Sequence, residues 1–119
     1  MIFKNKFSEV SKYNDDTLYI NYTLDEGFDE QSIDIFFQFM EKYFSKCDTT
    51  NLIFNLSKGS MRFSCKYGGK LNKFFSKFEC QIDENYMICK KSLKPFIKMY
   101  TKITKKPVKY IKELSEVEV

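Results

Sequence analysis

Leu52-Ile53-Phe54-Asn55-Leu56 lies between two stretches of polar, turn-forming residues, Asp48-Thr49-Thr50-Asn51 before it and Ser57-Lys58-Gly59-Ser60 after it. Its branched and aromatic side chains do not alternate strictly with polar ones, which is typical of a β-strand covered on both faces. In a small domain, such a strand belongs to a largely parallel sheet packed against helices. We therefore expect residues 52–56 to form the central strand.

The chain before this strand predicts a hairpin and then a helix. Residues 7–13 and 17–23 are short stretches rich in aromatic and branched side chains, and Asn14-Asp15-Asp16 between them favours a turn. A helix that ends near Lys46 follows. Its apolar residues recur at helical spacing and are Ile33, Phe36, Phe37, Met40 and Phe44.

The sequence leaves open where this first helix begins and what its wide apolar face packs against. Ser32 and Asp29 are equally good N-caps. Ile35 and Phe39 lie beside the apolar stripe and widen it. A stripe this wide indicates either a helix packed deeply against its neighbours or a face for a dimer or another partner.

The chain after the central strand predicts a further helix and strand. A short second helix is expected at 71–78, with an inner face made of Leu71, Phe74, Phe75 and Phe78. Residues 81–85 are expected to be a polar turn. A second buried strand is expected at 86–89.

A third helix and a last strand complete the predicted fold. Ser92 is the expected cap of that helix, and Pro107 ends it before an edge strand at 108–114. Residues 115–119 are expected to fray. The order is β-β-α-β-α-β-α-β with right-handed crossovers, which predicts one α/β domain over residues 1–119 with a mixed sheet of four or five strands and three helices.

The composition argues against an enzyme. The chain has no histidine, so it lacks the usual general base, the commonest metal ligand and the side chain that titrates near neutral pH. The sequence shows no nucleophile–base spacing and no glycine pattern suited to phosphate. We therefore expect a non-catalytic protein with no cofactor, no metal and no small-molecule substrate.

The cysteines and the apolar segments bear on the compartment. Cys47, Cys65, Cys80 and Cys89 are widely and unequally spaced, which favours free thiols over a zinc site. The first residues hold no apolar core of signal-peptide length, and no later run is long enough to span a membrane. We expect a cytoplasmic protein with four reduced thiols.

Positive charge is concentrated near the C-terminus. Residues 85–112 contain nine lysines and no acidic residue. Five of these lysines follow steps of three or four and form a basic face on the third helix: Lys91, Lys94, Lys98, Lys102 and Lys105. This basic face is either a solvated outer surface or a contact for nucleic acid, an acidic protein surface or anionic lipid.

The layout of elements resembles the STAS domain, the fold of the bacterial anti-sigma-factor antagonists. The resemblance rests on the opening hairpin, a central strand followed by a loop with serine and glycine, and an ending of strand, helix, Lys106-Pro107-Val108 and strand. Residues 86–113 are also similar to small STAS-like proteins of large nucleocytoplasmic DNA viruses, and the bias toward residues with AT-rich codons agrees. The resemblance implies a STAS-like viral protein in the host cytoplasm or the virion.

The loop after the central strand is the site that the resemblance implies. In the antagonists it carries Asp-Ser-Ser-Gly, and a serine there is phosphorylated to release a kinase partner. The matching stretch is Phe63-Ser64-Cys65-Lys66-Tyr67-Gly68, with Ser64 at the aspartate position and Cys65 at a serine position, which argues against a phosphoswitch. The resemblance implies that this module binds a protein partner, or itself, through the loop and an adjoining helix face. The candidate partner-binding residues are Ser60, Arg62, Ser64, Cys65, Lys66 and Tyr67.

Overall fold

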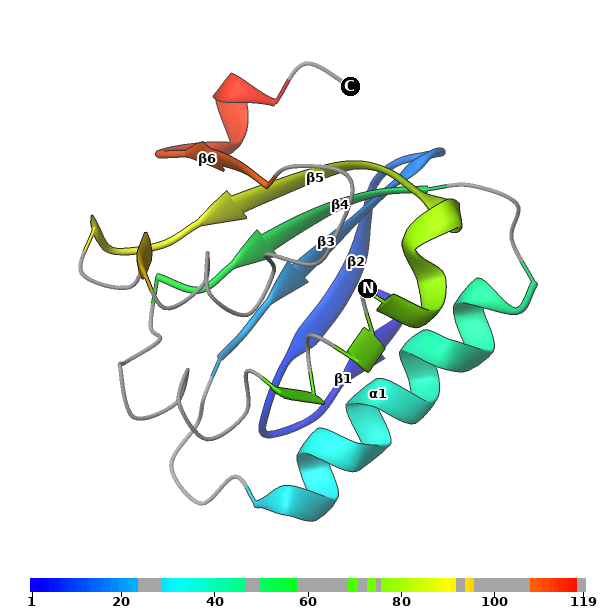
Figure 1. Ribbon diagram of the computed structural model, residues 1–119. Coiled ribbons are helices and arrows are strands. Elements are labelled where there is room, and N and C mark those ends of the chain that lie inside the picture. Colours follow the sequence, from blue (N-terminus) through cyan, green and yellow to red (C-terminus); the bar gives the residue numbers. More distant parts are fainter. Residues whose placement is uncertain are drawn as a thin grey trace.

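Six strands form one sheet, and their spatial order is their order in the chain (Figure 1). This computed structural model describes residues 1–23, 29–46, 50–57, 69–70, 73–74, 76–91, 94–95 and 108–117. The strands are β1 (Phe3–Lys4), β2 (Glu9–Asn14), β3 (Thr17–Asn21), β4 (Thr50–Asn55), β5 (Ile82–Ile88) and β6 (Lys109–Ile111). β1, β2 and β3 pair antiparallel, and β3 to β6 pair parallel.

The expected central strand is confirmed. β4 lies between β3 and β5 and pairs with both of them in parallel. Leu52, Ile53 and Phe54 are at most 1% exposed, although neighbouring residues of a strand point to opposite faces. Both faces of the sheet are therefore covered at β4, as the unbroken apolar run predicted.

Helix α1 (Glu30–Phe44) forms where the apolar residues recur at helical spacing. Of the two candidate caps, Asp29 is the one used, since its carboxylate accepts hydrogen bonds from the backbone N–H and the hydroxyl of Ser32 at 2.8 and 2.9 Å. The inner stripe of α1 is buried and consists of Ile33, Phe36, Met40 and Phe44. The helix is thus held by packing on one side.

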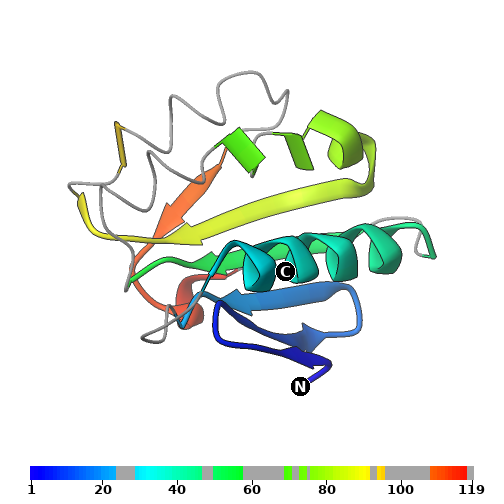
Figure 2. The same cartoon turned by 90° about the horizontal axis from the view of Figure 1, so that it is seen from below.

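A second helical stretch lies on the same face of the sheet as α1. Residues 69–70, 73–74 and 76–78 are helical, and we call these residues the 69–78 segment; the 3₁₀ turn η1 (Glu79–Gln81) follows it. Figures 1 and 2 both place α1 and this segment on one side of the sheet. The Phe74 ring packs on the Phe44 ring at 5.3 Å, and the Phe78 ring lies at the same distance from Phe44.

The last described residues of the chain lie near the opposite face of the sheet. Ile53 pairs with Tyr19 and Tyr86, so these three side chains point away from α1. The 3₁₀ turn η3 (Leu114–Glu116) lies on that side in both views (Figures 1 and 2). The Tyr13 hydroxyl in β2 donates to the Leu114 carbonyl at 3.5 Å, so after β6 the chain returns at η3 toward β2.

Two expected strand boundaries are wrong. Residues 82–85 are part of β5 instead of a polar turn, because Ile82 and Asn85 are buried against β4, where they pair with Thr50 and Leu52. The last strand is shorter than residues 108–114. The Glu116 carboxylate accepts from the backbone N–H groups of Lys112 and Glu113 at 2.5 and 2.8 Å, which turns the chain into η3.

The number of strands also exceeds the expected four or five. β1 adds a sixth strand of two residues, with Phe3 opposite Val10. The hairpin at β2 and β3 and the first helix are confirmed. Of the expected third helix, residues 92–93, with the cap Ser92, and residues 96–107 lie outside the described part of the chain. The same holds for Leu71 and Phe75 of the expected second helix and for residues 118–119, whereas Ser115 and Glu116 are in η3.

Candidate functional site

Most of the sequence-predicted site lies outside the described residues. This holds for the whole candidate loop, Ser60, Arg62, Ser64, Cys65, Lys66 and Tyr67, and for Lys98, Lys102 and Lys105 of the basic face. Lys91 is described and exposed. Lys94 is half-buried, and its ammonium lies 5.1 Å from the centre of the Tyr110 ring.

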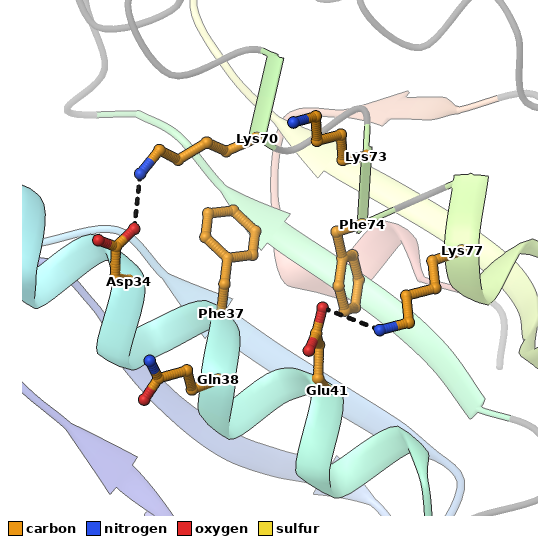
Figure 3. Close-up of a pocket in the computed structure, with 8 residues that line it drawn as sticks. All are labelled: Asp34, Phe37, Gln38, Glu41, Lys70, Lys73, Phe74 and Lys77. Atoms are coloured by element: carbon orange, nitrogen blue, oxygen red, sulfur yellow. Dashed lines mark hydrogen bonds and ion pairs between the residues drawn. The ribbon is translucent and has the colours of Figure 1, made fainter.

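A groove between α1 and the 69–78 segment is the candidate site among the described residues (Figure 3). Its volume is about 470 Å³. We call it the lysine groove. It is lined by Asp34, Phe37, Gln38, Glu41, Lys70, Lys73, Phe74 and Lys77.

The α1 wall of the groove is polar because of its helical register. Asp34, Gln38 and Glu41 follow steps of four and three residues, so they share one side of the helix next to the buried stripe. Phe37 lies between this side and the core, and its ring is 5.0 Å from the ring of Phe36. Phe37 is only half-buried and leaves an aromatic surface in the groove.

The opposite wall carries the three lysines. Lys70, Lys73 and Lys77 follow steps of three and four residues along the 69–78 segment. Phe74 is 4% exposed and anchors this wall against Phe44. The Gln81 side chain adds a second anchor, since its amide donates to the Phe44 carbonyl at 2.6 Å.

Two ion pairs span the lysine groove. The Lys70 ammonium lies 2.6 Å from the Asp34 carboxylate, and the Lys77 ammonium lies 3.3 Å from the Glu41 carboxylate. Figure 3 shows the Phe37 ring between these two pairs. Lys73 has no hydrogen bond or ion pair with any residue in the described part of the chain, and Gln38, the residue between Asp34 and Glu41 on this wall, carries no charge.

The chemistry of these side chains suits binding. The lining residues supply ammonium groups, carboxylates, an amide and aromatic rings, and they include no hydroxyl, thiol or imidazole. Both carboxylates are engaged by lysines and are partly exposed to solvent. Over the described ranges, no group of three or more Cys, Asp or Glu residues is placed to hold a metal ion.

The two described cysteines are free thiols in different settings. Cys80 is exposed, and Cys89 is half-buried. Burial raises the pKa of the Cys89 thiol, and the nearby positive charge of Lys94 offsets part of that shift. Burial also raises the pKa of Tyr110, which packs under the Lys94 ammonium.

Sequence reasoning missed the lysine groove. The sequence contains two sets of polar residues at helical spacing that later line the groove, Asp34/Gln38/Glu41 and Lys70/Lys73/Lys77. This pattern became informative only through the contact of Phe44 with Phe74 and Phe78, which brings the two helical stretches together. A contact between residues thirty positions apart is not visible in local periodicity.

In comparisons with known proteins, no family model, no curated protein and no solved structure matches this chain. The STAS resemblance therefore stays a prediction from the layout of elements. Among the described residues, no helix is both long enough and apolar enough to cross a membrane.

Proposed function

We propose that this protein is a non-catalytic, STAS-like interaction module that binds a protein partner through the lysine groove. The observation that carries the proposal is the half-buried Phe37 ring, which lies in an open groove between two charged walls. An apolar contact surrounded by polar residues is the usual plan of a protein-binding surface. In the sequence, Lys70 of the groove follows directly after the loop that the STAS resemblance implies as the partner site.

The surroundings of the groove support the same function. Ile35, on another side of α1, is 42% exposed, and Phe39 packs on Phe3 at 4.7 Å without being fully buried. The wide apolar stripe of α1 is thus only partly used inside the fold. This favours the interpretation of α1 as a partner face, and self-association is one form of it.

Site-specific photo-crosslinking tests the proposal. A benzophenone amino acid replaces Gln38 in the groove, and a matched variant carries it at Lys12, which is exposed on β2. In the cells that natively express the protein, we expect a discrete protein adduct from position 38 and none from position 12. Light scattering after size exclusion then separates a partner from a second copy of the chain.

The proposal fails if both positions give the same adducts or if position 38 gives none. It also fails if a strictly monomeric protein turns over a substrate in an activity screen. The viral origin and the cytoplasmic or virion location implied by the resemblance are tested by the cells in which the protein is found.

The alternative function is binding of nucleic acid or an anionic surface through the basic face. Lys91 and Lys94 are the members of this face that the structure describes. Since the Lys94 ammonium packs over Tyr110, it is less available to an outside anion than a fully exposed lysine. The lysine groove is therefore the better supported site.

A further inference from the structure

We infer that the lysine groove recognises an acidic residue of its partner, an aspartate or glutamate adjacent to a large apolar side chain. The carboxylate of that residue pairs with Lys73, and the apolar side chain contacts Phe37. This inference rests on the proposed function, because it names the chemistry of the partner that the groove binds. It follows from the charge pattern of the two walls.

The charges of the two walls are complementary at both ends of the groove but not in the middle. Along α1 the groove presents acid, amide and acid, and along the 69–78 segment it presents three lysines. The outer lysines pair with the outer acids at 2.6 and 3.3 Å. Lys73, the middle lysine, has the neutral Gln38 as the middle residue of the facing wall, so one positive charge is left without compensation within the groove.

An outside carboxylate supplies the missing charge. The Lys73 side chain is exposed, so its ammonium contacts a ligand without any rearrangement of the fold. No buried ion pair has to break. Charge-assisted hydrogen bonds of this kind are stronger than neutral ones. The attraction between the two charges becomes stronger when the ligand also excludes water from around the ammonium.

The apolar part of the ligand is specified by the two phenylalanines. The rings of Phe37 and Phe74 are 6.1 Å apart, and Phe37 is the more exposed of the two. Figure 3 shows Phe37 pointing from α1 into the groove, toward the wall that carries Lys70 and Lys73. A leucine, isoleucine or phenylalanine next to the acidic residue covers this ring and shields the Lys73 contact.

The same charge pattern disfavours a polyanion. Asp34 and Glu41 lie on either side of the Gln38 position, so a ligand with a negative charge at every step meets two carboxylates as well as the lysines. A nucleic acid backbone is such a ligand. A single acidic residue with neutral or basic neighbours avoids this repulsion, and for this reason we infer a protein partner.

Peptide selection tests the inference without assuming a partner. A phage-displayed library of random linear peptides is selected against the full-length protein, and the winning peptides are measured in solution by fluorescence anisotropy. We expect the winners to share an acidic residue next to Leu, Ile or Phe. We expect Lys73→Glu to weaken their binding by roughly tenfold or more, the change expected from losing one charge-assisted contact.

Two further variants separate the charge from general damage to the surface. Gln38→Glu adds a third negative charge to the α1 wall, which repels the acidic residue of the peptide, and is expected to weaken the same peptides several-fold while the protein stays folded. Lys46→Glu makes the same charge reversal at an exposed site just after α1, outside the groove, and should leave binding unchanged. Replacing the acidic residue of the peptide by its amide should weaken binding and remove the sensitivity to Lys73→Glu.

The inference is overturned if no peptide is selected or if the selected peptides lack an acidic residue. It is also overturned if Lys46→Glu matches the effect of Lys73→Glu, or if a single-stranded oligonucleotide displaces the peptides at equal concentration. Crosslinks from position 38 to a partner whose binding is indifferent to Lys73→Glu would refute this inference alone. The proposed function would then stand.

Discussion

Asp29 determines where α1 begins, and its effect depends on pH. Its carboxylate accepts two hydrogen bonds from Ser32, and these bonds hold the pKa of Asp29 below its usual value. A lowered pKa in the folded state means that the charged cap stabilises the fold at pH values above the ordinary pKa of this carboxyl in the unfolded chain. That stabilisation is lost as the pH falls through the lower pKa of the folded state.

We predict that Asp29→Ala lowers the thermal midpoint at pH 7 and that its deficit shrinks as the pH falls below about 4. Asp29→Asn should retain most of the stability at pH 7, because the amide oxygen still accepts a hydrogen bond from Ser32. Thermal unfolding followed by circular dichroism from pH 7 to pH 3 measures both effects. Asp15→Ala, an exposed carboxylate in the β2–β3 turn, is the control. An equal deficit at every pH would contradict the prediction.

The thiols give a second prediction for single residues. At pH 7.5 we expect Cys89 to react with iodoacetamide several-fold more slowly than Cys80, because Cys89 is half-buried and its pKa is raised, and the thiolate is the reactive form. Peptide mass spectrometry over a time course measures both rates. In 6 M guanidinium the difference should disappear. Protection of a fixed pair of cysteines before any reductant is added would show a disulfide and refute the expectation of reduced thiols.

At the scale of elements, Phe44 joins α1 to the 69–78 segment, which forms the opposite wall of the lysine groove. It is fully buried, and its ring packs on Phe74 and Phe78 at 5.3 Å from each. We predict that Phe44→Ala lowers the free energy of unfolding by about 3–5 kcal/mol, the usual cost of removing a buried ring. Urea unfolding measures it. Ile35→Ala, on an exposed side of the same helix, should stay within about 0.5 kcal/mol of the parent. A small effect at Phe44 would mean that the two helical stretches do not depend on this contact.

The elements also show what the sequence predicts well. β4 and α1 were predictable because each has a local signal, an unbroken apolar run in one and a 3.6-residue period in the other. The strand over residues 82–85 was not predictable, because the acidic residues Asp83 and Glu84 make this short stretch look like a polar turn when only its own sequence is considered. Only pairing with β4 reveals that Ile82 and Asn85 face the interior. β1 has two residues, too few for any periodicity, and it exists through its pairing with β2.

The candidate site was less predictable than the fold. The wide apolar stripe of the first helix was visible in the sequence, where it indicated either a deeply packed helix or a partner face. The groove itself depends on how Asp34 meets Lys70 and how Glu41 meets Lys77, which are tertiary contacts. Sequence reasoning placed the site on a loop at 60–69 instead, by resemblance. Residues 60–68 of that loop lie outside the described part of the chain, so its role stays a prediction.

Over the whole molecule, charge is the property that separates the proposed function from its alternative. The chain carries a formal net charge of +4, with nine lysines and no acidic residue over residues 85–112. In the described part of the chain, several lysines are paired with acids, including Lys70, Lys77 and Lys109, whose ammonium is 2.8 Å from Glu84. Paired lysines contribute little to the attraction of a polyanion.

We therefore predict weak, salt-sensitive binding of duplex DNA that depends on the basic face and not on the lysine groove. Retention at about 20 mM salt should be lost by about 150 mM, since each phosphate contact releases counterions and few contacts form. The triple change Lys94, Lys98 and Lys102 to Glu should abolish the low-salt retention. The matched triple change Lys70, Lys73 and Lys77 to Glu should leave most of it, because two of these lysines are already neutralised by Asp34 and Glu41. Electrophoretic mobility shifts across a salt series measure all three proteins. Binding that persists at 150 mM salt and prefers one sequence would instead favour the nucleic-acid function, since non-specific electrostatic binding does not distinguish sequences.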